Sequence, residues 1–362
     1  MITKPTLLID ETQARKNIRM MLAKANASKV DFRPHFKTHF SADIGEWYRK
    51  EGINKITVSS IDMAVYFASH GWDDITIAFP VNILEVAILN DLAQRITLNL
   101  VVVSLETVQF LNQNMQYGVN IWLKIDTGYS RTGIPANQIE NIQKIISEIQ
   151  TPLNFKGILA HFGHSYKIKG KSEVQKIYDA GISKLTHLKN EIHMKDCLIS
   201  IGDTPSCSLI NEFKGVDEIR PGNFVFYDLM QEQIGSCSLD KIAVCMACPV
   251  VAIHKERNEI VVHGGAVHFS KEHITNETGK NIYGKIVLLT SDGWGKLPIE
   301  DVFVKSVSQE HGIISATTAF INKTKVGDLL GILPIHSCLT ANLMKDYLTL
   351  DGKRLKSMNS IS

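Results

Sequence analysis

The strongest constraint on the fold is a regular alternation of short apolar runs with amphipathic, helix-length segments between about residues 10 and 230. An opening helix is predicted over 11–27, where apolar residues such as Ile18 and Met21 recur at helical spacing. Eight strands are predicted to follow, at 30–36, 55–60, 74–80, 98–104, 119–126, 155–163, 197–202 and 218–228. Strands that alternate strictly with helices predict a (β/α)8 barrel of the TIM type.

The composition of these runs favours parallel strands. Most of them are apolar without a clean polar alternation, as expected when both faces of a parallel sheet are covered. A doubly wound open sheet is the main alternative, and it would normally carry a glycine-rich turn after its first strand. No such turn follows the first predicted strand, so we favour the barrel.

The pattern changes after about residue 240. Strand-like segments then follow one another with turn residues between them and no long helical pattern, at 242–254, 258–269, 285–291, 301–308, 311–318 and 326–336. This predicts a C-terminal, mostly antiparallel β domain. We therefore expect a barrel domain over 10–240 and a β domain over 241–362, with residues 1–9 as a candidate additional strand of the β domain.

Composition and charge exclude several classes of protein. The chain has 362 residues, 44% of them hydrophobic, and a formal net charge of +2, so neither a nucleic-acid nor a membrane partner is indicated. Charges interrupt the first residues too early for a signal peptide, and no apolar stretch is long enough to span a bilayer. The six cysteines are scattered, as in a reducing compartment. We expect a cytoplasmic protein.

Polar residues gather at the carboxyl ends of the predicted strands, where barrel enzymes hold their active sites. They are Lys37, Arg131, His161, His164, Tyr166, Tyr227 and Asp228. Lys37 ends the first strand between two histidines, and partial burial at a barrel rim lowers the pKa of a lysine and makes it a usable amine. A solvated lysine at a strand end is the commoner alternative.

The segment after the seventh strand predicts a helix start, with Thr204 as the N-cap and Pro205 at the first helical position. The free N–H groups of such a start, with Gly202 beside it, can hold a phosphate. On this segment alone, an ordinary capped turn is the favoured interpretation. The carboxylate of Asp203 would have to point away from a phosphate.

Two cysteine patterns predict different roles. His336 and Cys338 are one residue apart, which on a strand places both side chains on one face, and imidazole with thiolate is a zinc-type ligand pair. A buried cysteine beside an unrelated histidine is the alternative. Cys245 and Cys248 lie three apart within an apolar strand, so they point to opposite faces and are interpreted as core cysteines.

Several motifs occur together in one order. After a T-x-x-x-D opening they are RPHFKTH, DTGYSRTG, HFGHSY, SIGDTPS, RPGNFVFYD, SQEHG and PIHSCLTANL. From about residue 3 to 345 the chain therefore resembles fold-type III pyridoxal-phosphate enzymes, in the branch of D-threonine aldolase and the eukaryotic-type D-serine dehydratase. The resemblance implies an alanine racemase-like barrel with a β domain, in a homodimer.

The resemblance also implies a cofactor site. Lys37 would hold pyridoxal 5′-phosphate covalently. Gly202, Asp203 and Thr204 would bind its phosphate through backbone or side-chain donors, with help from Tyr227.

Other positions stay open within the resemblance. Arg131 and Tyr166 are both candidates for the pyridine ring and its nitrogen. The segment 309–311 (Gln-Glu-His) resembles a loop near the metal or the substrate. Phe40 departs from the family pattern, which often has a second lysine after the KTH motif, so the group that meets the substrate carboxylate stays open.

By resemblance, His336 and Cys338 would bind the metal. A cysteine as second ligand is typical of the dehydratases, whereas the aldolases tend to have a hard carboxylate; a thiolate favours zinc, with another divalent metal as the alternative. The resemblance thus implies a lyase for a small β-hydroxy D-amino acid, foremost D-serine. The alternatives, in order, are a D-threonine aldolase, an amino-acid racemase and a non-catalytic pyridoxal-phosphate carrier.

Overall fold

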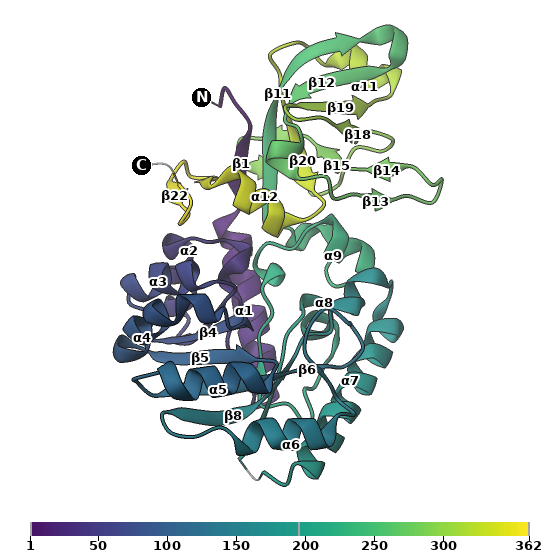
Figure 1. Cartoon of the computed structure of the whole chain (residues 1–362). Coiled ribbons are helices and arrows are strands. Elements are labelled where there is room, and N and C mark those ends of the chain that lie inside the picture. Colours follow the sequence, from purple (N-terminus) through teal and green to yellow (C-terminus); the bar gives the residue numbers. More distant parts are fainter. Residues whose placement is uncertain (1, 195, 361–362) are drawn as a thin grey trace. The chain divides into compact units, whose positions relative to one another are not determined.

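The computed structural model describes residues 2–194 and 196–360 (Figure 1). Its contacts define two compact units that are interleaved in the sequence. The barrel unit comprises Arg19–Lys37 and Gly45–Gly222, and the C-terminal unit comprises Met1–Ile18, Thr38–Ile44 and Asn223–Ser362. The single boundary near residue 240 stays a prediction. None of the described helices is long and apolar enough to cross a membrane.

The barrel unit is built on eight parallel strands in the order β2-β10-β9-β8-β6-β5-β4-β3. They are β2 (Asp31–Phe32), β3 (Ile56–Val58), β4 (Asp74–Pro80), β5 (Thr97–Val102), β6 (Val119–Asp126), β8 (Leu153–Ala160), β9 (Leu198–Ile201) and β10 (Glu218–Ile219), with the short β7 (Ile134–Pro135) beside β6. The two ends of the sheet meet, because His35 pairs with Thr57 and the Thr57 N–H donates to Pro34 O at 2.9 Å. The predicted barrel is confirmed.

Helices alternate with these strands and lie around them (Figure 1). They are α1 (Glu11–Ala27), α2 (Ala42–Lys50), α3 (Ile61–Ser69), α4 (Val86–Arg95), α5 (Leu105–Asn114), α6 (Ile139–Ser147), α7 (Lys171–Glu191) and α8 (Thr204–Leu209). Serine N-caps start two of them: Ser60 accepts the N–H of Met63, and Ser104 accepts the N–H of Thr107. The opening helix has the predicted bounds.

The eighth predicted strand was too long. The sequence predicts a strand over 218–228, but β10 ends at Ile219. Pro221 lacks the N–H that a sheet ladder needs, and Asn223–Val225 form a 3-10 turn. The apolar residues that follow, such as Phe224, are buried without belonging to a strand, so apolarity misled the strand assignment.

The C-terminal unit contains a nine-stranded, mostly antiparallel sheet in the order β12-β19-β18-β15-β20-β11-β1-β21-β22. Its strands are β1 (Thr6–Ile9), β11 (Val244–His254), β12 (Glu259–His263), β15 (Gly284–Val287), β18 (Phe303–Val307), β19 (His311–Ser315), β20 (Leu329–Pro334), β21 (Asp346–Thr349) and β22 (Arg354–Lys356). The small pairs are β13 (Ile274–Thr275) with β14 (Asn281–Ile282), and β16 (Leu289–Thr290) with β17 (Gly293–Trp294). The helices are α9 (Leu229–Ile234), α10 (Ala266–Phe269), α11 (Thr318–Lys323) and α12 (Ser337–Met344).

Two features of this sheet follow from the sequence. The N-terminal β1 lies between β11 and β21, antiparallel to the first and parallel to the second. Cys245 and Cys248 on β11 are fully buried free thiols, which confirms their interpretation as core cysteines. The expected antiparallel β architecture of the C-terminal part is confirmed.

Candidate cofactor and metal sites

Lys37 lies in a 3-10 turn, Phe36–Thr38, a few residues after the first barrel strand ends at Phe32, and it is half-buried. His35 fixes the backbone there: its N–H donates to Pro221 O at 2.9 Å, and its Nδ1 accepts the Lys37 N–H at 3.4 Å. Burial holds the pKa of His35 well below its usual value, and the charges of Lys37 and Arg220 lower it further. His35 is therefore a neutral acceptor at pH 7, and barrel closure itself positions the lysine.

A group of cations surrounds this position inside the barrel unit. Lys124 on β6 is buried, and its pKa lies well below the usual range because of burial and because of the charges of Arg220, Arg131 and Lys37. Burial lowers the pKa of Arg220 to about 10. His161 is neutral for the same reasons of burial and nearby cations. Such an excess of positive charge suits an anionic ligand.

Buried hydrogen bonds fix the guanidinium of Arg220. Its Nε donates to Ser200 Oγ at 2.7 Å, and its Nη2 donates to Ala160 O at 2.8 Å. Ser200 Oγ in turn donates to Glu218 Oε1 at 2.7 Å, and Glu218 Oε2 accepts from Arg33 Nε at 2.6 Å. The sequence analysis does not predict Lys124 or Arg220 as site residues. Two signals were available for them: Lys124 is a lysine within the apolar run of β6, and Arg220 is the first residue of the RPGNFVFYD motif.

The segment before α8 differs from its prediction by one residue. Asp203, and not Thr204, is the N-cap, and Pro205 takes the second helical position. The reason is that Asp203 Oδ2 accepts the Ser206 N–H at 2.8 Å. The same oxygen accepts from Ser165 Oγ at 2.9 Å, so the carboxylate is engaged in the cap. Oδ2 of this carboxylate is therefore directed at the helix cap and at Ser165.

This segment contains polar atoms that are already hydrogen-bonded and a buried hydroxyl without a partner among the described residues. The Thr204 N–H donates to Tyr166 Oη at 3.3 Å, and His161 Nδ1 is hydrogen-bonded to Gly202 O. The buried hydroxyl of Thr204 has no hydrogen-bond partner within the part of the chain that the structure describes. Buried orphan hydroxyls are rare in proteins, and at a helix start they fit a phosphate group. The predicted residues Gly202, Asp203, Thr204 and Tyr166 thus come together.

Asp203 gives a pH-dependent prediction. Burial raises its pKa from 3.8 to about 6, although hydrogen bonds from Ser206 and Ser165 lower it in part. The folded state therefore binds more protons than the unfolded state between about pH 4 and 6, and this group makes the protein less stable as pH rises through that window. Asn also caps helices well, so Asp203→Asn should raise the free energy of unfolding at pH 7.5 by up to about 3 kcal/mol. Urea unfolding at pH 4.5 and 7.5 measures this; equal pH dependence of the two proteins would contradict it.

Arg131 and Tyr166 have different immediate partners. Its guanidinium stacks over the ring of Tyr129 at 5.0 Å, and that ring lies 5.8 Å from the ring of His161. Arg131 also contributes to the lowered pKa values of Lys124 and His161. Arg131 therefore belongs to the cationic group, whereas the hydroxyl of Tyr166 belongs to the start of α8.

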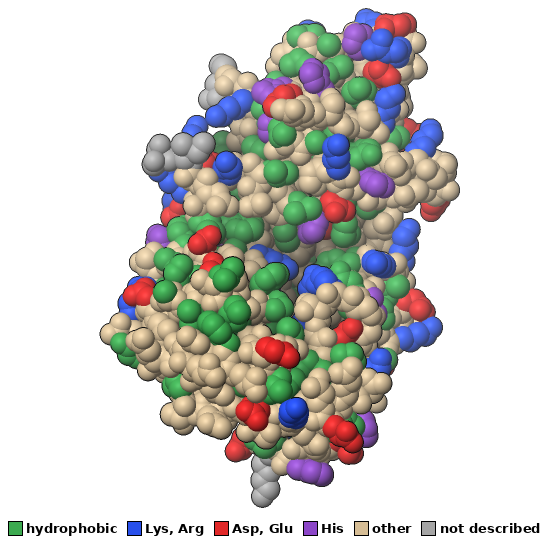
Figure 2. All heavy atoms as spheres, in the orientation of Figure 1, with side chains coloured by type: hydrophobic (Ala, Val, Ile, Leu, Met, Phe, Trp, Pro, Cys, Tyr) green, Lys and Arg blue, Asp and Glu red, His purple; other side chains and the backbone are tan. Residues whose placement is uncertain are grey.

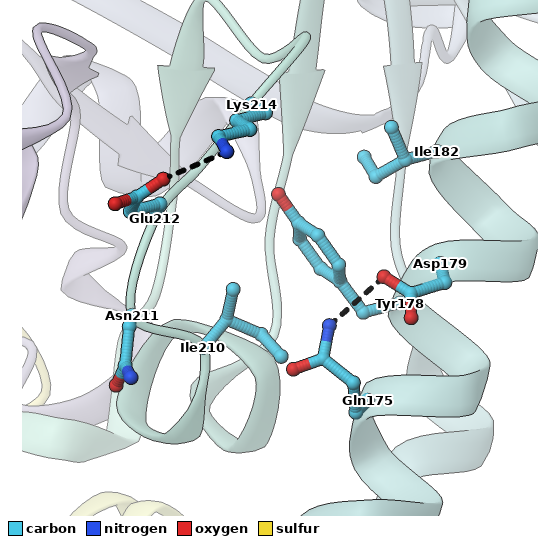
Figure 3. A pocket seen from close by; sticks show the side chains of 8 residues that line it. All are labelled: Gln175, Tyr178, Asp179, Ile182, Ile210, Asn211, Glu212 and Lys214. Carbon is cyan, nitrogen blue, oxygen red and sulfur yellow. Dashed lines mark hydrogen bonds and ion pairs between the residues drawn. The ribbon is translucent and has the colours of Figure 1, made fainter.

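A cavity of about 460 Å³ in the barrel unit lies elsewhere, between α7 and the segment after α8 (Figure 3). Four of its polar side chains are paired with each other: Gln175 with Asp179 at 2.8 Å, and Lys214 with Glu212 at 3.1 Å. None of the site residues predicted from the sequence lines this cavity. It therefore does not contribute to the candidate site.

The predicted metal pair, His336 and Cys338, lies in the C-terminal unit, on a different element from the one predicted. β20 ends at Pro334, His336 is the N-cap of α12, and Cys338 is the second residue of that helix. The prediction that both side chains share a strand face was therefore wrong. The side chains of His336 and Cys338 nevertheless form a hydrogen bond.

Charge and burial act against each other in this pair. Burial alone lowers the pKa of His336, but the hydrogen bond and charge of Cys338 and the charge of Asp228 raise it to about 9. Burial raises the pKa of Cys338, but His336 outweighs that effect and lowers it. The thiolate form of Cys338, which is the form that ligates metals, is thereby stabilised. The donor set of one thiolate and one imidazole fits zinc.

A buried polar network surrounds the predicted metal pair. Asp228 Oδ2 accepts the Ser337 N–H at 2.9 Å and Asn223 Nδ2 at 2.6 Å. Asn223 Nδ2 also lies 3.5 Å from Cys338 Sγ, and Thr38 Oγ1 lies 3.4 Å from the same sulfur. Residues that orient metal ligands in this way tune the affinity for the metal.

The predicted residue Tyr227 precedes this aspartate in the C-terminal unit. It is fully buried, and its φ of 49° is left-handed, a conformation that costs a residue with a side chain about 1–2 kcal/mol. The next residue, Asp228, caps α9 by accepting the Gln231 N–H at 2.9 Å. The left-handed turn at Tyr227 therefore immediately precedes the residue that joins the starts of α9 and α12.

Asp228→Ala should be strongly destabilising. It would leave the N–H groups of Ser337 and Gln231 without their buried acceptor and would remove one acceptor of the Asn223 amide. Unpaired buried donors each cost about 1–3 kcal/mol, so we expect a loss of about 3–5 kcal/mol of unfolding free energy. Asp62→Ala in the first turn of α3, on the barrel exterior, is the control and should change stability by less than about 1 kcal/mol. Equal unfolding midpoints in urea for the two variants would refute this role of Asp228.

By its fold, the protein belongs to the class that combines a closed (β/α)8 barrel with a mostly antiparallel β unit. The family model described as "Alanine racemase, N-terminal domain" matches residues 9–229, and the model described as "Putative serine dehydratase domain" matches residues 243–350. The chain therefore belongs to the family of proteins with an alanine racemase N-terminal domain. Pyridoxal phosphate is the cofactor expected from this family.

Several similar proteins are named as dehydratases or aldolases. D-serine dehydratase from Dictyostelium discoideum is 29% identical, over 96% of this chain and 93% of that protein. D-threo-3-hydroxyaspartate dehydratase from Delftia sp. (strain HT23) is 26% identical over 96% and 94%, and its solved structure superposes with a TM-score of 0.89, at 24% identity over 100% and 99% of the two chains. The structure of D-threonine aldolase from Filomicrobium marinum has a TM-score of 0.82 at 17% identity over 98% and 95%.

Proposed function

We propose that this chain is a pyridoxal-phosphate- and metal-dependent lyase that converts D-serine into pyruvate and ammonia. The observation that carries the proposal is the His336–Cys338 pair, a soft donor set whose sulfur is stabilised as thiolate, in a barrel protein with a lysine at the end of its first strand. A racemase needs no metal pair, and a cofactor carrier needs no C-terminal unit. The dehydratase names of the similar proteins support the same choice.

The barrel unit would hold the cofactor. Lys37 would bond to it covalently, and the orphan hydroxyl of Thr204, the backbone of Gly202 and Asp203 and the hydroxyl of Tyr166 would hold its phosphate. Tyr227 would assist in binding the phosphate. When bound, pyridoxal phosphate withdraws electrons from the Cα of an amino acid attached to it.

The proposal also includes a residue for the pyridine nitrogen. Since the hydroxyl of Tyr166 lies at the start of α8, we propose Arg131 for the pyridine nitrogen. An arginine donates hydrogen bonds and does not accept them, so it would leave that nitrogen unprotonated. The anchored guanidinium of Arg220 and the neutral ring of His161 complete the surroundings of the cofactor in this proposal.

In the proposed reaction, Lys37 Nζ takes the proton from the substrate Cα. His336 and Cys338 would hold zinc, which supplies a Lewis acid for the departing β-hydroxyl. The hydroxyl leaves as water, and the released 2-aminoacrylate hydrolyses to pyruvate and ammonia. Thr38, whose hydroxyl contacts Cys338 Sγ, follows Lys37 directly in the sequence.

We also propose a cytoplasmic homodimer. All six cysteines are free, which suits a reducing compartment. Exposed apolar side chains of the barrel unit, including Phe79, Leu84 and Ile88, offer a surface for a second copy. The space-filling view shows hydrophobic side chains gathered over the side of the barrel unit that carries α3 and α4 (Figure 2). A monomer in sedimentation equilibrium would contradict this assembly.

A substrate panel tests the proposed reaction. Purified protein reconstituted with pyridoxal phosphate and zinc should release a keto acid from D-serine, with L-serine as the control. D-threo-3-hydroxyaspartate belongs in the panel because of the name of one similar protein. Glycine and an aldehyde from D-threonine, without keto acid from any substrate, would replace the dehydratase with an aldolase. Bound cofactor without any turnover would support a carrier.

A further inference from the structure

Two histidines and a glutamate of the C-terminal unit form a cluster separate from His336 and Cys338. His263 ends β12, His268 lies in α10, and Glu310 lies between β18 and β19. Nε2 of His263 and Nε2 of His268 lie 3.6 and 3.8 Å from Glu310 Oε2, and one ligand atom from each residue lies within 4.8 Å of the others. We propose that this cluster is a second divalent-metal site, best suited to zinc.

The two loops that carry the cluster are held tightly together. The Gly264 N–H donates to Glu310 O at 2.9 Å, and the Ala266 N–H donates to Ser308 O at 2.7 Å. A Cβ at Gly265 would collide with the carbonyl oxygen of Ser308, so this close approach requires glycine. Pairing of β12 with β19 places the ends of the same two loops side by side. The frame of the cluster is therefore built by backbone contacts that do not depend on a metal.

The donor set is that of an open zinc site. Two imidazoles and one carboxylate bind zinc in known enzymes and leave a fourth position for water or substrate. Zinc–nitrogen bonds of about 2.0–2.1 Å in a tetrahedron place ligand atoms roughly 3.3 Å apart. The distances from Glu310 exceed this by only a few tenths of an ångström, and the side chains of His263 and Glu310 are 40% and 50% exposed, so they are free to adjust.

One contact opposes metal binding and limits its strength. The Gly265 N–H donates to His268 Nδ1 at 3.1 Å, so the proton of a neutral His268 sits on Nε2. A metal at Nε2 requires the proton on Nδ1 and so loses this hydrogen bond, which lowers the affinity on the order of fivefold.

The open position of such a metal has a neighbouring cavity. His263 and His268 line a cavity of about 380 Å³ together with Lys4 and Arg354. Neither of these cations forms an ion pair within residues 2–194 and 196–360. A small carboxylate or phosphate group is the class of ligand that would meet both the metal and these cations.

Metal titration of the full-length protein tests the second site without relying on turnover. Chelator-treated protein should bind two equivalents of Zn²⁺ in competition with a chromophoric chelator. His263→Ala with Glu310→Gln, both at partly exposed positions, should bind one equivalent, about a hundredfold or more tighter than any residual binding at the altered site. His254→Ala removes a histidine that has one carboxylate neighbour, Glu256 at 3.6 Å, but no second histidine, and it should still bind two.

Cobalt distinguishes the two sites by spectrum. One Co²⁺ bound to the His263→Ala/Glu310→Gln protein should show the near-ultraviolet thiolate-to-cobalt band of a cysteine ligand. One Co²⁺ bound to His336→Ala/Cys338→Ala should show visible bands of a four-coordinate ion without that feature. One equivalent of Zn²⁺ in the wild-type protein, or two in the folded His263→Ala/Glu310→Gln protein, would overturn the proposal.

Discussion

Lys37→Ala should abolish the covalent attachment of pyridoxal phosphate and reduce D-serine turnover by at least about 10³-fold. Lys37 supplies the proposed covalent bond and also the proposed base for the Cα proton, so alanine removes both functions at once. The turn that carries Lys37 is held by backbone bonds of His35, so the substitution should leave the barrel intact. The visible absorbance of the bound cofactor and the rate of keto-acid release measure the two losses.

Borohydride reduction and peptide mapping sharpen this test. In the wild-type protein, reduction should leave the pyridoxyl group on the peptide that contains Lys37. Lys50→Ala, at an exposed position in the last turn of α2, is the matched control and should keep the spectrum, the label and the activity. A label on Lys124 instead, or an unchanged spectrum in Lys37→Ala, would remove Lys37 from its proposed role.

Cys338→Ala should lose the proposed catalytic zinc and with it D-serine dehydration, again by about 10³-fold or more. The substitution removes one of the two proposed protein ligands, and a single remaining imidazole would bind zinc only weakly. Metal content after dialysis and keto-acid release measure the effect. The cofactor spectrum should persist, because Lys37 is unchanged.

Two further substitutions separate the metal role from packing. Cys237→Ala removes another buried free thiol of the C-terminal unit and should keep both metal and activity. Cys338→Asp replaces a soft ligand by a hard one and should shift the preference from zinc toward manganese. Full activity of Cys338→Ala in the presence of a chelator would show that the reaction does not use this pair.

The fold could be predicted because its signals are local and repeated. The alternation of strands and helices predicts the barrel, and helical spacing predicts the bounds of α1. Errors arise where an apolar run is buried for another reason, as at Phe224 after Pro221, which was taken for a strand. The same limitation put His336 and Cys338 on a strand, because PIHSC continues an apolar run, whereas α12 starts there.

The candidate site could be predicted in part. Lys37 and the start of α8 were found because rim positions and helix-start residues are visible in a sequence. The hydrogen bonds around these residues could not be predicted, because they join residues far apart in the chain. Arg33 with Glu218 is one case, and Asp228 with Ser337 is another. The roles of Lys37, His336 and Cys338 stay predictions.

Pyruvate release from D-serine by the purified protein, before and after removal of metal, tests the central claim most directly. We expect pyruvate and ammonia in equal amounts, loss of this activity after chelator treatment, and its return with zinc while the absorbance of the bound cofactor stays constant throughout. Keto-acid release that is unaffected by the chelator, or no keto acid from D-serine with cofactor and zinc both bound, would contradict the account.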